Sequence, residues 1–322
     1  MKVNLIYEGW LDDHLHYRAA YDRLVAEIEL VLNGGPAIVA PVLGLSGTGK
    51  TELLKDIAER LADRLTSKGR PAVLVVSFPP GATAEAVAER IIKCILGIRT
   101  VKGTGYQLRE RARELLAGSG TLVLILDEAN HAAEARSTRS TQTKTNRLTA
   151  DWIKEIVDVA MVSVVFSGLP HSRRLLTDNE QLEGRALRPI ELNPYAWHIA
   201  EDRHAFHELV YAFAGHARAS GWAIDMSNDM LVRATYMTGR GLVRPVRRLF
   251  ERAVVLASAS RVITNSVFAT AFDHCFQESV SGNPFTLEKI TDEMLNAAHR
   301  QMLQSAHEPQ RRGRDRSEGR DG

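Results

Sequence analysis

Eight consecutive residues carry the clearest chemistry in this sequence: Gly44-Leu45-Ser46-Gly47-Thr48-Gly49-Lys50-Thr51. Glycines at this spacing let backbone N–H groups turn toward a phosphate, and a helix that begins at Lys50 adds the positive end of its dipole. The Lys50 ammonium is expected to contact the β- and γ-phosphates, and the Thr51 hydroxyl to bind Mg²⁺. We therefore expect ATP and Mg²⁺ on a loop formed by Gly44, Ser46, Gly47, Thr48, Gly49, Lys50, Thr51 and Glu52.

A pair of carboxylates forms the expected second half of this site. Asp127 and Glu128 directly follow the apolar run 122–126, and Asp127 lies 77 residues after Lys50. In parallel sheets, ligands bind at the carboxyl ends of the strands. Asp127 is therefore expected to hold Mg²⁺ through water, and Glu128 to act as the general base that polarises the attacking water.

Three further polar residues are candidates for the same site. Ser167 follows the apolar run 162–166, where it could contact the γ-phosphate or the attacking water, cap the helix after Pro170, or do both. Arg185 precedes the last expected strand, where ring and filament ATPases place an arginine that enters a neighbour's site. Its competitors are Arg173, Arg174 and Arg188. In the C-terminal half, Arg244 is expected to lean onto the phosphates, with Arg240 and Arg247 as alternatives.

The elements that position these residues follow an alternating pattern. Apolar runs at 37–43, 72–78, 122–126, 162–166 and 187–192 alternate with helical patterns at 15–33, 50–67, 84–96, 107–117 and 148–159. Continuously apolar strands between helices predict a parallel five-stranded sheet covered by helices on both faces. Residues 131–146 are rich in Ser, Thr and Arg and are expected to be a polar loop.

After Pro194 the pattern becomes helical. We expect helices near 201–219, 227–237, 243–258, 264–276 and 287–304, and no strand between 200 and 300. The predicted organisation is an N-terminal segment over 1–14, an α/β nucleotide-binding domain over 15–195 and an all-helical lid domain over 196–305. The last stretch, 306–322, lacks large apolar residues and is expected to be a disordered tail.

Composition restricts the class of protein. The 322 residues are 44% hydrophobic and 25% charged, with a net charge of +2, which are the values of an ordinary globular protein. The two cysteines lie in unrelated contexts, which suits a reducing compartment. We find no signal-peptide core and no apolar run of membrane-spanning length, and so expect a cytoplasmic protein without membrane contact.

The order of phosphate loop, Asp-Glu strand, polar strand end, arginine and helical lid resembles the AAA+ ATPases, over roughly residues 15–260. The lid segment 238–249 is similar to the lid motif of the initiator branch, except that Leu242 stands where that motif has Asp. Residues 127–131, 166–170 and 178–185 resemble the transposition regulators TniB, TnsC and MuB. The resemblance implies a homo-oligomer, ring or filament, that binds duplex DNA, marks a target site for a transposase and its targeting protein, and is dismantled by ATP hydrolysis.

Two segments offer the cations that backbone contact with duplex DNA requires. The loop 97–105 carries Arg99, Lys102 and Thr104, and the stretch 132–150 has a net charge of +3. The candidates in the second segment are Arg136, Arg139, Lys144 and Arg147. The residues give little sign of base reading, so we expect largely sequence-nonspecific binding. The alternative is an AAA+ loader or remodeller that acts on a protein partner without binding duplex directly.

Overall fold

The computed structural model describes residues 15–79, 83–133, 139–276 and 282–307, and for residues 132, 133, 139–145 and 307 it describes the backbone alone. The predicted segment 1–14 lies outside the described residues, as does the predicted tail from residue 308 onward. The chain divides into two compact units between Asn193 and Pro194, and each is described by itself.

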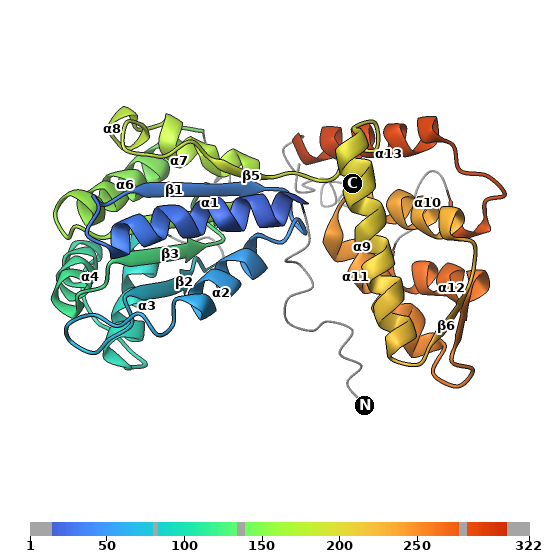
Figure 1. Ribbon diagram of the computed structural model, residues 1–322. Coiled ribbons are helices and arrows are strands. Elements are labelled where there is room, and N and C mark those ends of the chain that lie inside the picture. Colours follow the sequence, from blue (N-terminus) through green and yellow to red (C-terminus); the bar gives the residue numbers. More distant parts are fainter. Residues whose placement is uncertain (1–14, 80–82, 134–138, 277–281, 308–322) are drawn as a thin grey trace, which may run out of the picture. The chain divides into compact units, whose positions relative to one another are not determined.

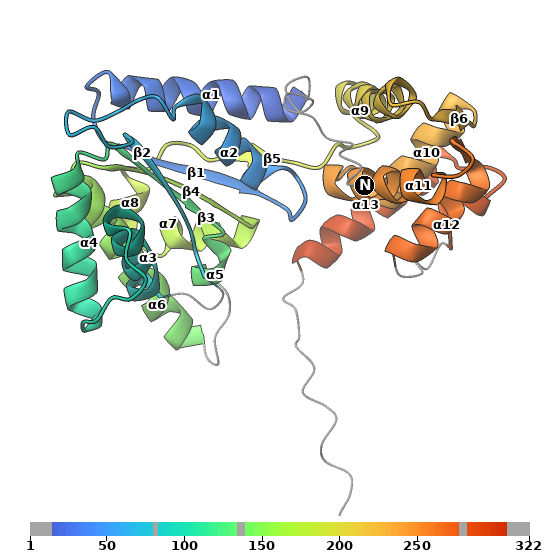
Figure 2. The ribbon, with the colours of Figure 1, turned by 90° about the horizontal axis from the view of Figure 1, so that it is seen from below.

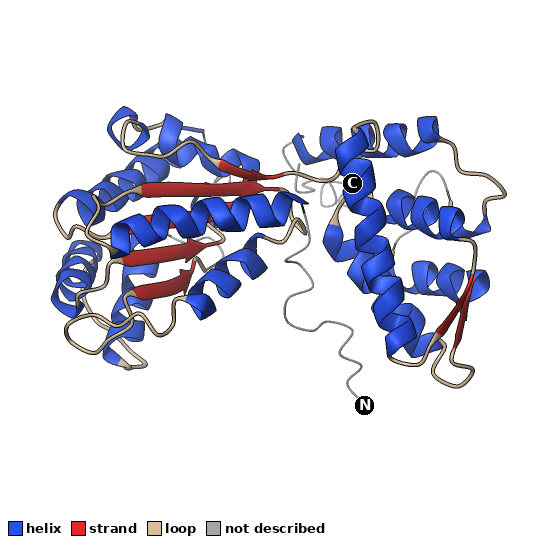
Figure 3. Ribbon diagram, viewed as in Figure 1, coloured by secondary structure: helices blue, strands red, loops and turns tan. Residues whose placement is uncertain are grey.

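The first unit is built on a parallel sheet (Figures 1 and 3). Its strands are β1 (Val39–Gly44), β2 (Val73–Ser77), β3 (Val123–Asp127), β4 (Ser163–Gly168) and β5 (Ile190–Leu192). They run in the order β2-β3-β4-β1-β5, and all four pairings are parallel. The five-stranded parallel sheet predicted from the apolar runs is therefore confirmed. Its register brings the carboxyl ends of β1, β3 and β4 to one edge.

Helices cover both faces of this sheet (Figure 2). One face carries α1 (Leu15–Leu32) and α2 (Lys50–Arg60), and the other carries α3 (Ala84–Leu96), α4 (Gly105–Ser119) and α6 (Arg139–Asp158). The short elements of this unit are α5 (Asn130–Ala133), η1 (Pro170–Arg173), α7 (Arg174–Thr177) and α8 (Glu180–Glu183). The strands β1, β3 and β4 are buried at every residue, because helices cover both faces of the sheet there.

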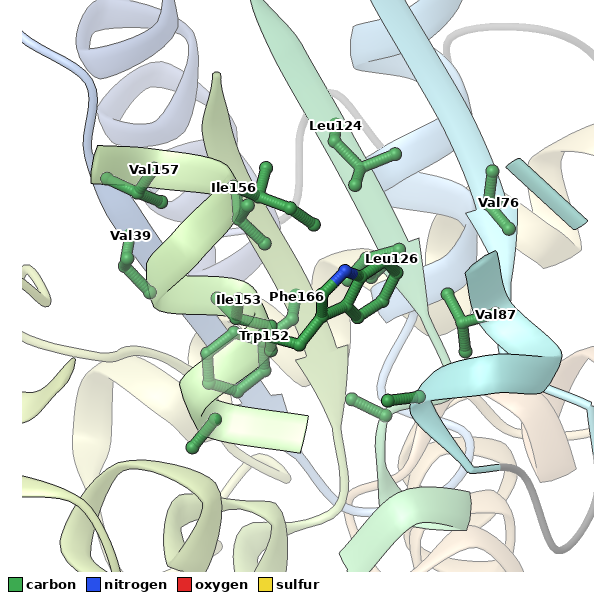
Figure 4. Close-up of a cluster of buried hydrophobic side chains, with 14 of the residues drawn as sticks. Val39, Val76, Val87, Leu124, Leu126, Trp152, Ile153, Ile156, Val157 and Phe166 are labelled. Atoms are coloured by element: carbon green, nitrogen blue, oxygen red, sulfur yellow. The ribbon is translucent and has the colours of Figure 1, made fainter. Parts of the chain in front are cut away.

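The main core lies on the α3, α4 and α6 face of the sheet. Figure 4 shows Trp152, Ile153 and Ile156 of α6 among the strand residues of this cluster. Leu124 and Leu126 of β3 and Phe166 of β4 are fully buried there. Burial of this apolar surface is the main force that holds β3 and β4, and so the polar residues at their ends, in fixed positions.

The second unit is mainly helical, with one difference from the prediction. Its helices are α9 (Ala200–Ala219), α10 (Asn228–Gly239), α11 (Val243–Leu256), α12 (Asn265–Cys275), η2 (Pro284–Thr286) and α13 (Asp292–His307). The expectation of no strand between 200 and 300 was wrong, because β6 (Ala223–Asp225) and β7 (Val262–Thr264) form a parallel pair. Three residues are too few for a strand pattern to stand out in a sequence.

An aromatic stack forms the centre of the helical unit. Phe250 of α11 stacks on Phe213 of α9, with ring centroids 5.3 Å apart, and meets Phe268 of α12 edge-on at 5.3 Å. All three rings are buried. One side chain therefore joins three helices.

Replacing Phe250 by alanine should destabilise the protein by about 3–5 kcal/mol, because it leaves a cavity where three helices meet. The free energy of unfolding from urea denaturation measures the effect. The matched control is Val255→Ala on the same helix, since Val255 is 48% exposed. Equal losses for both variants would contradict this description of the core.

Candidate functional site

The loop between β1 and α2 has the conformation that a phosphate cradle needs. Gly47 and Gly49 adopt φ angles of +90° and +102°, a region that residues with a Cβ rarely occupy. The Thr48 hydroxyl donates to the Leu45 carbonyl at 2.9 Å and closes the turn. The loop then passes directly into α2 at Lys50, so the N-terminus of an 11-residue helix adjoins the turn. This is the strand–loop–helix arrangement expected from the sequence.

Gly44 is required for a different reason, because there is no room for a side chain at this position. A Cβ at this position would lie 2.4 Å from the carbonyl oxygen of Leu192 on β5, closer than atoms can approach. The carbonyls of Gly44 and Leu45 accept hydrogen bonds from the buried Lys50 ammonium, at 2.8 and 2.9 Å. The lysine charge is thus held inside the loop, where it fits an anionic phosphate group.

The remaining predicted loop residues lie around this turn. Ser46 is exposed, whereas Thr51 and Glu52 in the first turn of α2 are half-buried. Glu52 lies 3.5 Å from the ammonium of Lys55, also on α2. Thr51 directly follows Lys50 in the first turn of α2, which adjoins the phosphate loop. A hydroxyl and a carboxylate are the oxygen ligands that Mg²⁺ prefers, so Thr51 and Asp127 suit the metal in donor type.

Asp127 is buried at the end of β3 and is held by two donors. The Ser167 hydroxyl donates to Asp127 Oδ1, and the Glu128 backbone N–H donates to the same oxygen at 2.9 Å. The two strand ends are also joined by the Ala129 N–H, which donates to the Ser167 carbonyl at 2.7 Å. Of the two roles considered for Ser167, the helix cap is wrong, because Leu169 occupies the N-cap of η1. Ser167 instead orients Asp127.

Glu128 has a strained backbone. Its φ angle is +61°, in the left-handed region, where a residue with a side chain loses about 1–2 kcal/mol. This conformation ends β3 and turns the chain into α5. Uncommon backbone conformations persist where the surroundings impose them, and they concentrate at functional sites. The half-buried Glu128 is thereby fixed directly after the buried carboxylate.

Arg185 lies at the opposite end of the sheet from the phosphate loop. Its neighbour Ala186 pairs with Val39, the first residue of β1, whereas the loop begins after Gly44, the last. Five strand steps separate the two ends, or about 17 Å. Arg185 is exposed and donates to Asp158 Oδ1 and to the Gln181 carbonyl, both at 2.7 Å. The sequence alternatives Arg173, Arg174 and Arg188 are also exposed.

The lid arginines differ in their surroundings. Arg244 is exposed in the first turn of α11. Arg240 is half-buried and adopts a left-handed φ of +53° as the C-cap of α10. Arg247 pairs with Glu251 one turn later, at 2.9 Å. Arg244 is thus the most exposed of the three, and its role as the phosphate-sensing arginine stays a prediction.

The loop between α3 and α4 runs back along the length of α3. The Glu85–Arg109 ion pair joins the first turns of both helices, and the cations Lys68 and Arg70 bind the carbonyls of Gly118 and Ile95 at their far ends. The two helices therefore run parallel. Because α3 follows the carboxyl end of β2, the end of this loop returns to the edge of the sheet that carries Asp127.

The predicted DNA-contact residues of this loop are therefore spread along it. Arg99 lies just beyond the far end of α3, whereas Lys102 and Thr104 lie close to the start of α4. The side chains of Arg99 and Lys102 are exposed. Thr104 is the N-cap of α4 and forms a reciprocal capping box with Gln107, so its hydroxyl already has a structural partner.

The second predicted DNA segment is not a continuous loop. Residues 131–146 were expected to be a polar loop, but α5 covers Asn130–Ala133 and α6 begins at Arg139. Repeated Ser and Thr lowered the apparent helix propensity, and the structure shows that packing of the later turns of α6 overrides it. Arg139, Lys144 and Arg147 therefore lie on a helix, Arg147 with an exposed side chain. Arg136 lies outside the described residues.

One residue of the site was not predicted. Tyr17 of α1 is buried, its hydroxyl donates to Asp56 of α2, and its ring lies 3.7 Å from where a Cβ of Gly49 would be. It therefore packs behind the phosphate loop. Its spacing in the sequence indicated only the apolar face of a helix, since the contact depends on how α1 and α2 pack.

Comparison with protein families supplies one match. The family model described as bacterial TniB protein matches residues 12–196, more than half of the chain. A comparison with curated proteins found no match. Among the helices of the described residues, none is both long and apolar enough to cross a membrane.

Several solved structures share the fold. The Orc1 protein of Aeropyrum pernix, solved in complex with DNA, is 15% identical, with a TM-score of 0.62 over 94% of this chain and 86% of its own. Cdc6p of Pyrobaculum aerophilum is 16% identical, with a TM-score of 0.63 over 87% and 72%. The Orc2 protein of A. pernix, with ADPNP and ADP, is 14% identical, with a TM-score of 0.58 over 91% and 74%. At these identities the likeness establishes the AAA+ fold.

Replacing Lys50 by alanine should weaken ATP binding at least tenfold, because the only ammonium among the predicted loop residues is removed. Titration with a fluorescent ATP analogue measures the affinity. Lys55→Ala is the matched control, since this exposed lysine lies on the same helix. Unchanged affinity in the Lys50 variant would reject the loop as the phosphate site.

Proposed function

The chain belongs to the bacterial TniB family of transposition-associated AAA+ ATPases, and we propose that it is an ATP-dependent assembly factor on DNA. In this proposal ATP binding drives oligomerisation on duplex DNA, the oligomer marks a target for a transposase, and hydrolysis dismantles it. The observation that carries the proposal is the Ser167–Asp127–Glu128 arrangement at the strand edge that also bears the phosphate loop.

The chemistry follows from the residues at this edge. Lys50 neutralises charge on the phosphates, and Thr51 and Asp127 would hold Mg²⁺, which supplies charge stabilisation when bound. Ser167 fixes the orientation of the Asp127 carboxylate through its hydrogen bond. Glu128, held next to Asp127, accepts the proton of the attacking water. Hydrolysis requires all five groups, whereas binding requires chiefly the loop.

Arg185 supports completion of the site by a neighbouring subunit. An arginine about 17 Å from its own phosphate loop cannot offset charge on its own nucleotide. It is exposed, and its guanidinium is oriented by Asp158 and the Gln181 carbonyl. A preoriented, exposed arginine of this kind can stabilise the charge on the phosphoryl group transferred in the next subunit. Hydrolysis would then depend on assembly.

Duplex DNA is the proposed binding partner of the assembled form. Lys102 is exposed near the strand edge that carries Asp127, and Arg147 is exposed on α6. Both cations suit contact with DNA phosphates. Such contacts fix the protein on the duplex without recognising the base sequence. The Orc1 structure solved with DNA shares this fold and supports a DNA-facing surface in the same architecture.

Subunit mixing tests the role of Arg185. Arg185→Ala and Glu128→Gln should each lower steady-state hydrolysis at least a hundredfold, because each removes a group needed in the transition state. Mixing the two variants should restore part of the activity, since one supplies the arginine and the other supplies the base. Arg218→Ala, an exposed arginine of α9, is the control. A mixture as inactive as its components would reject action in a neighbouring site.

Charge reversal tests the DNA surface. In a Glu128→Gln background with ATP, the Arg99→Glu, Lys102→Glu variant should bind duplex at least tenfold more weakly, with a shallower salt dependence. The set Arg136→Glu, Arg139→Glu, Lys144→Glu tests the second segment separately. Arg218→Glu, Arg300→Glu is the control with the same change of net charge as the first variant. If the parent protein does not bind duplex with ATP, the proposal fails and the protein-loader alternative remains.

A further inference from the structure

The segment that leaves β5 is fixed at both of its ends. Leu192 pairs with Gly44 at the start of the phosphate loop. Three residues later, the Tyr195 N–H donates to the Gly241 carbonyl at 3.0 Å, in the turn that precedes Arg244. Only Asn193 and Pro194 lie between, and three Cα steps span at most about 11 Å. The strand end and the arginine-bearing turn are therefore joined by a very short stretch of chain.

The hydroxyl of Tyr236 is the centre of this attachment. It donates to the Tyr195 carbonyl at 2.7 Å and accepts from the Trp197 N–H at 3.0 Å. The side chain is fully buried, and its ring meets Trp197 and Phe206 edge-on. Burial raises the pKa of the Tyr236 hydroxyl well above its ordinary value, so the group remains a donor at every physiological pH. One hydroxyl thus hydrogen-bonds the backbone on both sides of Ala196, at Tyr195 and at Trp197.

His299 joins the last helix to the same point. Its Nδ1 lies 3.0 Å from the Arg240 carbonyl and 3.3 Å from the Tyr236 hydroxyl. A carbonyl oxygen only accepts, so Nδ1 carries the hydrogen and donates. The turn it holds has little freedom, because a Cβ at Gly241 would lie 2.1 Å from the Tyr195 carbonyl oxygen.

The start of α13 is fastened separately. Arg233 of α10 pairs with Asp292 at 2.6 Å and with Asp229 at 2.9 Å, and its guanidinium lies over the Trp197 ring, 5.5 Å from the centroid. The hydrogen bond from Arg233 lowers the pKa of Asp292. Two points of α13 are therefore attached next to the segment that leaves β5, at Asp292 and at His299.

We propose that Tyr236 and His299 are positioning residues that couple the nucleotide state, through residues 192–197, to the arginine-bearing turn 239–244, so that α13 takes part in the response to ATP. The proposal rests on the proposed ATPase function for its kinetic readout. It also predicts a conformational readout that needs only nucleotide binding. A molecule that binds α13 would then change the ATPase rate without touching the nucleotide.

The test compares His299→Ala and Tyr236→Phe with His299→Asn in the full-length protein. The asparagine amide lies close to the position of Nδ1 and restores the donor. In the first two variants the KM for ATP should stay within threefold, kcat should fall at least fivefold, and His299→Asn should recover at least half of the lost rate. His204→Ala, an exposed histidine of α9, is the control.

Hydrogen exchange supplies the second readout. A non-hydrolysable ATP analogue should slow exchange of residues 239–244 in the parent protein and in His299→Asn, but not in His299→Ala. The proposal is overturned if His299→Ala and Tyr236→Phe merely lower the melting temperature while kcat and the exchange response are retained. It is also overturned if the parent protein shows no exchange response. A parent protein that responds in exchange but does not hydrolyse ATP would reject the ATPase function and leave the coupling intact.

Discussion

The pairing of β1 with β4 on one side and β5 on the other is the constraint on which the site depends. It places the phosphate loop, Ser167 and, through β3, Asp127 at one edge of the sheet. It also presses the Leu192 carbonyl against Gly44, so that the strand leading out of the domain touches the loop. The same pairing puts Arg185 near the first residue of β1, at the opposite end of that strand from the phosphate loop.

The sequence alone predicts those parts of the site whose residues are close together in the chain. The phosphate loop needs only glycines and a lysine at fixed spacing, and Asp127 and Glu128 follow a short apolar run whose length and flanking residues predict a buried strand. Ser167 was identified, yet its partner was not, because Asp127 lies 40 residues earlier and the two meet only through sheet register. Tyr17 packs against the loop, a contact that its place on the apolar face of a helix does not predict.

The remaining differences have physical causes of the same kind. The first turns of α6 are rich in Ser and Thr, whose weaker helix propensity argued against a helix that the later apolar turns stabilise. The strands β6 and β7 are three residues each, below the length at which alternation can be recognised. Tyr236 and His299 are 63 residues apart, so their hydrogen bond could not be anticipated from spacing.

The strand order has a consequence for how the protein folds. Val39 of β1 pairs with Val164, which emerges 125 residues later during synthesis, and Gly44 pairs with Leu192. Closing loops of this length is entropically costly, and sheets rich in such distant pairings fold slowly. The phosphate loop therefore remains incomplete on the ribosome until β4 and β5 have been made. Nucleotide in the cell can stabilise the finished domain but cannot guide its early folding.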